Sequence, residues 1–189
     1  MPFNSSESIS TDIFDLIHFD VWRLSPVSSI GGFRYFVIFV DDYSHYSWIF
    51  HMKHHSELLQ VYSNFAKMVE TQFFKRIKIF QSDNALEYIQ YAFQAVLHSC
   101  GIVHQLTCPG TSQQNGRAER KFHHILDTVR ALFLFVKVLV LFWGKAALHA
   151  INRIPSPVIH NQTPYKRLFG SPPDYHHLCS FGSACFVFL

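Results

Sequence analysis

The sequence predicts an α/β fold in which a mixed five-stranded sheet carries helices on both faces. Hydrophobic residues make up 49% of the 189 residues and charged residues 15%, so the chain has ample material for a buried core. Apolar runs joined by short polar turns fill its first quarter, which is typical of an antiparallel meander. Helical and strand patterns then alternate, as in sheets with parallel strands.

Each expected element rests on its own pattern. The first three strands are rich in aromatic and β-branched residues, and each is followed by a polar turn. A helix begins at Ser56, where apolar residues recur at a spacing of three and four. Gly101 ends the next helix, and two prolines follow the last one. Strands are expected over residues 13–22, 33–40, 47–52, 77–80 and 102–106, and helices from residue 56 and over 91–99, 118–135 and 142–153. This order of elements is the ribonuclease H-like arrangement.

The chain divides into three predicted segments. Residues 1–12 are polar and are expected to be a disordered N-terminal segment, whereas 13–155 form the core. The proline-rich residues 156–189 form a C-terminal extension that starts a downstream region and contains a candidate strand over 184–189. The most apolar stretch, 131–143, is shorter than the roughly 20 residues of a membrane span, so a buried helix and no membrane partner are expected.

Charge is distributed unevenly along the chain. Residues 1–94 contain 7 Lys and Arg against 10 Asp and Glu, whereas residues 95–189 contain 9 against 3. An acidic half beside a basic half suits a site that holds cations next to an anionic polymer. Ordinary solvated surface is the alternative interpretation. The four cysteines form no Cys-x-x-Cys pattern and are expected to be free thiols.

Three carboxylates lie at the edges of expected elements. Asp20 lies within the first strand, Asp83 follows the fourth strand, and Glu119 opens a helix. Adjacent first and fourth strands would bring the two aspartates together, and the helix would add the glutamate. Carboxylate oxygens are the ligands that Mg²⁺ prefers, and two such ions can promote phosphoryl displacement. Alternatively, each residue serves only as a turn or cap residue.

Three other acidic residues have similar positions in the sequence. Asp41, Asp42 and Glu87 also flank apolar runs, so their position alone does not distinguish them from the three carboxylates.

The motifs FDVW, QSDNALEY, GIVHQLTCPGTSQQNGRAERK and TPYKRLFG resemble the integrase catalytic core of Ty1/copia-type retrotransposon Pol polyproteins. The resemblance implies a retroviral-type Asp-Asp-35-Glu triad at Asp20, Asp83 and Glu119, which are then both the catalytic residues and the metal ligands. It implies a two-metal site for Mg²⁺ or Mn²⁺. The implied activity is DNA integration by 3′-end processing and strand transfer. The implied partners are retroelement and target DNA and further copies of the chain, and the implied location is the nucleus.

A polar loop and its basic flank are predicted to bind nucleic acid. Small and amide-bearing residues precede the glutamate of the triad, and amides can donate hydrogen bonds to phosphates. Basic residues follow, where the DNA backbone would lie. The predicted contacts are Gln113, Gln114, Asn115, Gly116, Arg117, Arg120 and Lys121.

The sequence also departs from the pattern of the family it resembles. Gln81 stands where the family has Arg, Ala85 and Leu86 replace a Gly-Gly pair, and Arg23 replaces Gly. The family also places a zinc module before the core and a basic region after it, so strand transfer by this segment alone is expected to be low. The alternative function is therefore a degenerate, non-catalytic remnant that only binds nucleic acid or a protein partner.

Overall fold

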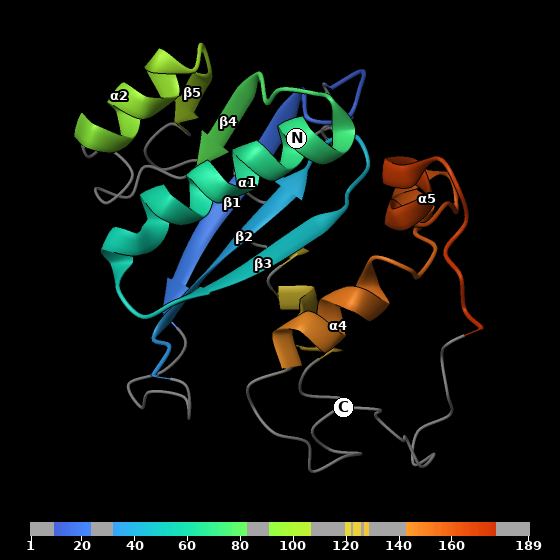
Figure 1. The fold of residues 1–189 in the computed structure, drawn as a ribbon. Coiled ribbons are helices and arrows are strands. Elements are labelled where there is room, and N and C mark those ends of the chain that lie inside the picture. Colours follow the sequence, from blue (N-terminus) through green and yellow to red (C-terminus); the bar gives the residue numbers. More distant parts are fainter. Residues whose placement is uncertain are drawn as a thin grey trace, which may run out of the picture.

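A computed structural model describes residues 10–23, 32–82, 91–106, 120–121, 123–125, 127–128 and 143–176. Its centre is a five-stranded sheet with the strand order β3-β2-β1-β4-β5 (Figure 1). The strands are β1 (Leu16–Arg23), β2 (Tyr35–Asp41), β3 (Ser47–Met52), β4 (Ile79–Ser82) and β5 (Val103–Leu106). β1, β2 and β3 pair antiparallel, whereas β4 is parallel to both β1 and β5. The predicted mixed sheet is confirmed.

The central strand β1 separates two kinds of side chain. Successive residues of a strand point to opposite faces of the sheet. Ile17 and Phe19 lie in one apolar cluster, and neither is exposed to solvent. His18 and Asp20 alternate with them and are also buried, at 4% and 6% exposure. The sheet therefore has one face that is apolar at β1 and one that is polar there.

Helix α1 (Leu58–Phe73) covers the apolar face of β1. Its buried residues Leu58, Tyr62, Phe65 and Val69 recur at the helical spacing and join a cluster dominated by phenylalanine. The rings of Phe39 and Phe65 stack at 4.4 Å between centroids, and so do those of Phe19 and Phe80. The chain leaves α1 through Phe74 in the left-handed conformation, with φ of 54°.

Helix α4 (Trp143–Ile151) packs on the opposite face (Figure 1). This face has a second cluster, to which Ile125 from the chain segment before α4 also contributes. Its buried members are Phe36, Ile38, Val40, Ile49, Ile125, Ala147, Leu148 and Ile151. The prediction of helices on both faces is therefore confirmed.

The other helices with defined bounds are α2 (Tyr91–Ser99), α5 (Pro164–Phe169) and the 3₁₀ helices η1 (His55–Glu57) and η5 (Pro157–Ile159). Helix α5 was not predicted from the sequence, although the local signals are present. Thr163 caps its first turn, Pro164 occupies the first helical position, and Gly170 ends it with φ of 76°. Leu168 of α5 is buried in the cluster beneath α1.

Several predictions fall on residues that the structure does not describe. They include the buried helix over 131–143 and the strand over 184–189. The segment boundaries after residues 12 and 155 stay predictions. Among the helices that are described, none is both long enough and apolar enough to cross a lipid bilayer.

Candidate active site

Asp20 lies on β1, the strand at the centre of the sheet. Its Oδ1 accepts a hydrogen bond from the backbone N–H of Val21 at 2.9 Å. Its Oδ2 accepts one from Nε1 of Trp22 at 2.7 Å. The carboxylate is therefore held in one orientation on the α4 side of the sheet.

The end of β4 lies beside this part of β1. The two strands pair in parallel, with His18 of β1 opposite Gln81 of β4. The last residue of β4, Ser82, is fully buried, and its hydroxyl lies 2.9 Å from Nε2 of His104 on β5. Asp83 is the next residue and lies outside the described part of the chain.

A helical segment within residues 120–128 packs over the same side of the sheet. The ring of His123 meets that of Trp22 edge-on at 6.5 Å, and Ile125 is buried in the cluster shared with α4. Nζ of Lys121 donates a hydrogen bond to the carbonyl oxygen of His45 at 3.2 Å. Glu119 immediately precedes this segment and is not among the described residues.

Only two of the predicted nucleic-acid contacts are described. Arg120 is exposed, whereas Lys121 is half-buried with its ammonium directed at the protein backbone. Burial lowers the pKa of Lys121 from 10.5 to about 8. Residues 113–117 of the predicted loop lie outside the described chain.

Comparison with known families identifies this arrangement. A model of the family described as "Integrase core domain" matches residues 12–112, which is more than half of the chain. The chain belongs to this family. The match spans the strands that carry Asp20 and lead to Asp83.

Relatives of this integrase core are retrotransposon polyproteins. It is 36% identical to the "Retrovirus-related Pol polyprotein from transposon RE2" of Arabidopsis thaliana, over 100% of the chain and 13% of that polyprotein. It is 35% identical to the corresponding polyprotein from transposon TNT 1-94 of Nicotiana tabacum, over 99% of the chain and 14% of that polyprotein. The chain thus spans about one seventh of these relatives. The resemblance to Ty1/copia-type Pol polyproteins is confirmed.

Solved structures confirm the ribonuclease H-like fold of the integrase core. The intasome of simian T-cell lymphotropic virus in complex with PP2A regulatory subunit B56 gamma gives a TM-score of 0.69 at 16% identity, covering 95% of this chain and 60% of that one. The catalytic core domain of HTLV-2 integrase in complex with magnesium, in its dimeric form, gives 0.62 at 14% identity, covering 83% and 97%.

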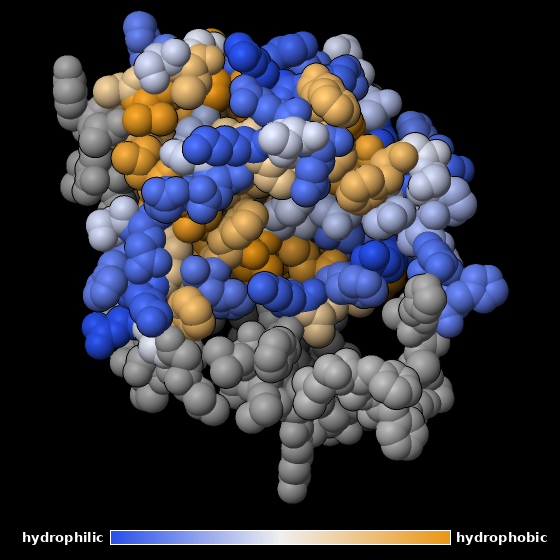
Figure 2. Space-filling model, viewed as in Figure 1, coloured by the Kyte–Doolittle hydropathy of each residue, from blue (hydrophilic) through white to orange (hydrophobic). Residues whose placement is uncertain are grey.

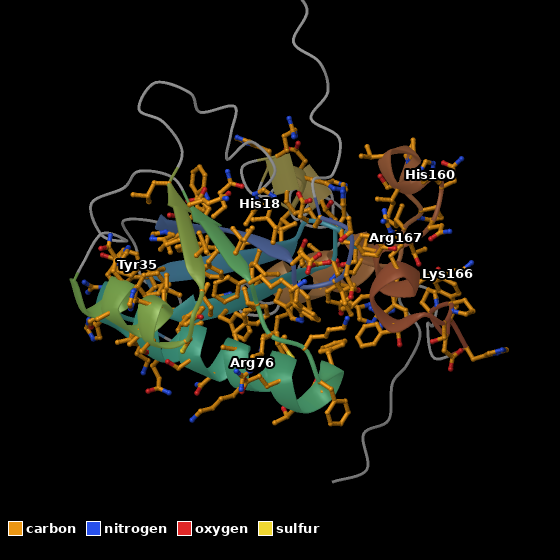
Figure 3. All side chains as sticks on the ribbon, turned by 90° about the horizontal axis from the view of Figure 1, so that it is seen from above. His18, Tyr35, Arg76, His160, Lys166 and Arg167 are labelled. Carbon is orange, nitrogen blue, oxygen red and sulfur yellow. The ribbon has the colours of Figure 1, made fainter. Side chains whose placement is uncertain are left out.

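The integrase core has a buried polar pair that sequence reasoning missed. Nε2 of His18 lies 2.8 Å from Oδ1 of Asp42, and both side chains are almost wholly buried. Oδ2 of Asp42 accepts a hydrogen bond from the hydroxyl of Ser10 at 2.6 Å. Figure 3 shows His18 on the opposite side of the sheet from α1 and Arg76. The available signal was the position of His18 two residues before Asp20, which places both on one face.

Asp41 has a structural role in the turn after β2. Its Oδ1 accepts a hydrogen bond from the N–H of Phe14 at 2.7 Å, and its Oδ2 accepts one from the hydroxyl of Ser44 at 2.6 Å. Burial raises the pKa of the Asp41 carboxyl. These contacts give Asp41 a role in fixing the turn after β2.

The predicted metal site falls only in part on the described residues. Within the described chain, no group of three or more His, Cys, Asp or Glu side chains is arranged to hold a metal ion. Of the three predicted carboxylates only Asp20 is described, and its oxygen atoms accept two hydrogen bonds. This donor chemistry fits Mg²⁺ or Mn²⁺.

Proposed function

We propose that this integrase core performs metal-dependent 3′-end processing and strand transfer of retroelement DNA, with Asp20, Asp83 and Glu119 as its catalytic carboxylates. The observation that carries the proposal is the docking of the segment after Glu119 on the Asp20 side of the sheet, through Trp22 and His123. A carboxylate from that segment has a short path to Asp20.

The strand register supports the role of Asp83. Leu16 pairs with Ile79 and His18 with Gln81 along the parallel β1 and β4 strands. Continued by two residues, this register would place position 83 beside Asp20. Neighbouring residues of paired strands share a face of the sheet, so both carboxylates would point to the same side.

Helical spacing supports the role of Glu119. Arg120 and Lys121 are helical, and His123 lies four residues after Glu119. Residues four apart lie on the same side of a helix. Because His123 contacts Trp22, whose indole donates to Asp20, one further helical residue would place the glutamate near that carboxylate.

The three carboxylates would hold two divalent ions, Mg²⁺ or Mn²⁺. When bound, such a pair lowers the barrier for attack of an oxygen on a phosphodiester and for departure of another. The role of the chain is to hold the carboxylates that would coordinate the metal ions in a fixed orientation. The N–H groups of Val21 and Trp22 prevent rotation of the Asp20 carboxylate, and the buried sheet beneath it keeps β1 rigid.

DNA would lie across the surface that begins at Arg120. This side chain is exposed at the start of the helical segment, where its guanidinium can bind a phosphate. Residues 113–117 would complete the contact. The related HTLV-2 core is dimeric and the simian viral protein was solved as an intasome, which supports assembly of several copies here.

Metal binding and DNA strand transfer test this proposal on the full chain. We expect Mg²⁺ or Mn²⁺ to bind the wild type, and Asp20→Asn, Asp83→Asn and Glu119→Gln each to weaken binding by about tenfold or more, because each removes a charged ligand. Asp127→Asn is the matched control, since it removes an exposed carboxylate from the same helical segment.

The same variants distinguish catalysis from the alternative function. Low but metal-dependent strand transfer that all three triad variants abolish would support the proposal. Metal affinity that is equal in the wild type and the triad variants would overturn it, and would favour a remnant that only binds nucleic acid or protein. Gln81, Ala85 and Leu86 are the departures that favour this alternative.

A further inference from the structure

The end of β4 is the point from which the chain leads to Asp83. Strand β4 pairs with β1 as far as Gln81, whereas its pairing with β5 continues to Ser82. The last residue of β4 is therefore held from the β5 side of the strand. Ser82 is fully buried, so its hydroxyl needs a hydrogen-bond partner inside the protein.

His104 of β5 is such a partner. Its Nε2 lies 2.9 Å from the hydroxyl of Ser82. In the strand register His104 is opposite Phe80, so its ring extends along the sheet toward the last residue of β4. Burial lowers the pKa of His104, and a neutral imidazole has one N–H and one acceptor nitrogen for such a bond. The pair thus joins the two strands at the place where β4 ends.

His104 also contacts the strand that carries Asp20. The centroid of its ring lies 6.4 Å from that of Phe19. Phe19 directly precedes Asp20, just as Ser82 directly precedes Asp83. One imidazole therefore contacts the residue before each of the two predicted aspartate ligands.

The pair of His104 and Ser82 lies on the opposite face of the sheet from Asp20. Phe19 and Phe80 belong to the apolar cluster beneath α1, and Ser82 follows Phe80 by two residues, so it points to the same face. Alternation along the strand would direct the next side chain to the other face. His104 therefore lies behind the predicted ligands and can act on them only through the backbone.

The surroundings of His104 are largely apolar. Its ring meets that of Phe93 edge-on at 6.1 Å, and it borders a cavity of about 550 Å³ that Leu97, His98 and Leu106 also line. Figure 2 shows apolar side chains at the surface of this part of the molecule, around α2. Apolar surroundings strengthen a hydrogen bond, and the cavity leaves room for other side chains at this position.

We propose that His104 positions Asp83: by holding Ser82, it fixes the end of β4 and thereby the direction in which the chain presents the next carboxylate. This inference rests on the proposed role of Asp83 as a metal ligand. Neighbouring Cα atoms are about 3.8 Å apart, so a movement of Ser82 is passed directly to Asp83. Because Mg²⁺ requires near-ideal ligand geometry, displacement of a carboxylate by about 1 Å weakens its binding.

Binding of Mn²⁺ to the full chain, measured by electron paramagnetic resonance, tests this role. We expect His104→Leu to weaken the affinity by about tenfold, the loss typical when a supporting hydrogen bond of a metal site is removed. His104→Gln should bind within about twofold of the wild type, because its terminal amide can reach the position of Nε2. His98→Leu changes an exposed histidine that borders the same cavity and should leave the affinity unchanged.

Ser82→Ala tests the same hydrogen bond from the other strand. It should weaken Mn²⁺ binding about as much as His104→Leu does. The double variant should bind no more weakly than either single variant, because both changes remove one interaction. Val69→Ala truncates a side chain elsewhere in the buried cluster beneath α1. It should lower stability and leave the Mn²⁺ affinity of the folded chain unchanged.

Exchange of backbone amide hydrogens provides a readout without metal. The N–H of Val103 donates to the carbonyl of Lys78, and by the alternation of the ladder the N–H groups of Phe80 and Ser82 face β5. We expect the N–H of Ser82 to exchange about tenfold faster in His104→Leu than in the wild type, because the end of β4 opens more often. The N–H of Phe80, nearer the middle of the strand, should change little.

Asp83→Asn is the reference for these measurements. If this variant binds Mn²⁺ as tightly as the wild type, the proposed function fails, and the positioning role of His104 fails with it. If binding depends on Asp83 but is unchanged in His104→Leu and Ser82→Ala, the positioning role alone is wrong. Equal losses of affinity in Val69→Ala and His104→Leu would also overturn it, because the pair would then serve only stability. Unchanged exchange at Ser82 in His104→Leu would contradict it without reference to metal.

Discussion

The two faces of the central sheet are formed by the same strands but carry different kinds of side chain. Beneath α1, the residues of β1 and β2 are Ile17, Phe19, Val37 and Phe39, and none is exposed to solvent. On the α4 side, β1 presents His18, Asp20 and Trp22. The buried apolar cluster there is formed by β2, β3 and the covering helices, and of the β1 residues only Trp22 packs against it.

The difference shows where this protein can accommodate polar chemistry. A buried carboxylate is tolerable only when it is hydrogen-bonded, and Asp20 and Asp42 each accept hydrogen bonds from neighbouring groups. The aromatic cluster on the opposite face supplies the burial that holds β1 in place. Substitutions on the α1 face should therefore affect mainly stability, and those near Asp20 mainly activity.

Phe80→Ala should produce the largest loss of stability. The Phe80 ring stacks on Phe19 and also contacts Phe39, Tyr62 and Phe93, without solvent exposure. Truncation of such a ring lowers the free energy of unfolding by about 3–5 kcal/mol. Urea denaturation measures the change, with Phe74→Ala as control because that side chain is 91% exposed. A loss below about 1 kcal/mol would show that the cluster repacks.

Hydrophobic pattern alone predicts the apolar face well. Runs such as the one over residues 33–40 admit few structures other than a buried strand, and all five strands were expected close to their observed positions. The observed strand ends differ from the predicted ones by a few residues, because hydrogen-bonded pairing between strands determines where each strand ends. Phe14, for example, was expected in the first strand but lies in a turn before it, in the left-handed conformation with φ of 65°. The short α5 was missed because its signal is capping and not periodicity.

The polar face is less predictable from sequence. Asp20 could be selected only through the resemblance, because Asp41 and Asp42 also flank an apolar run. What separates them is three-dimensional: Asp41 accepts hydrogen bonds from Phe14 and Ser44. The pairing of Asp42 with His18, and the amide of Asn152 on β3, join residues that are distant in sequence and have no local pattern.

Asn152→Ala tests whether the α4 face depends on its polar contacts. The change removes both hydrogen bonds to Ser47 and leaves a buried N–H and C=O at the edge of β3. We expect the free energy of unfolding to fall by about 2–3 kcal/mol, since each unsatisfied group costs about 1–3. Thermal denaturation measures this loss. Gln162→Ala, which removes an exposed amide, should change stability little, and equal effects of the two would contradict the argument.

Lys121 should make stability depend on pH. Its pKa is about 8 in the folded chain and near 10.5 when unfolded, so between these values the unfolded chain binds more protons. Stability should therefore rise with pH above about 8. Relative to Lys121→Met, the wild type should gain about 1–2 kcal/mol between pH 8 and about 9.5. Unfolding of both proteins across this range measures the gain, and parallel curves would show that Lys121 stays charged in the folded chain.

Asp20→Asn should change stability least while removing the response to metal. In the absence of metal the carboxamide can keep one of the two hydrogen bonds that Asp20 accepts, so the free energy of unfolding should fall by about 1 kcal/mol or less. Magnesium at tenfold its Kd should stabilise the wild type by about 1.4 kcal/mol, because it binds only the folded chain. The variant should show no such shift. Unfolding curves of both proteins with chelator and with magnesium provide the comparison. A metal-free loss as large as that of Phe80→Ala would mean that Asp20 is mainly structural, and the contrast between the two faces would fail.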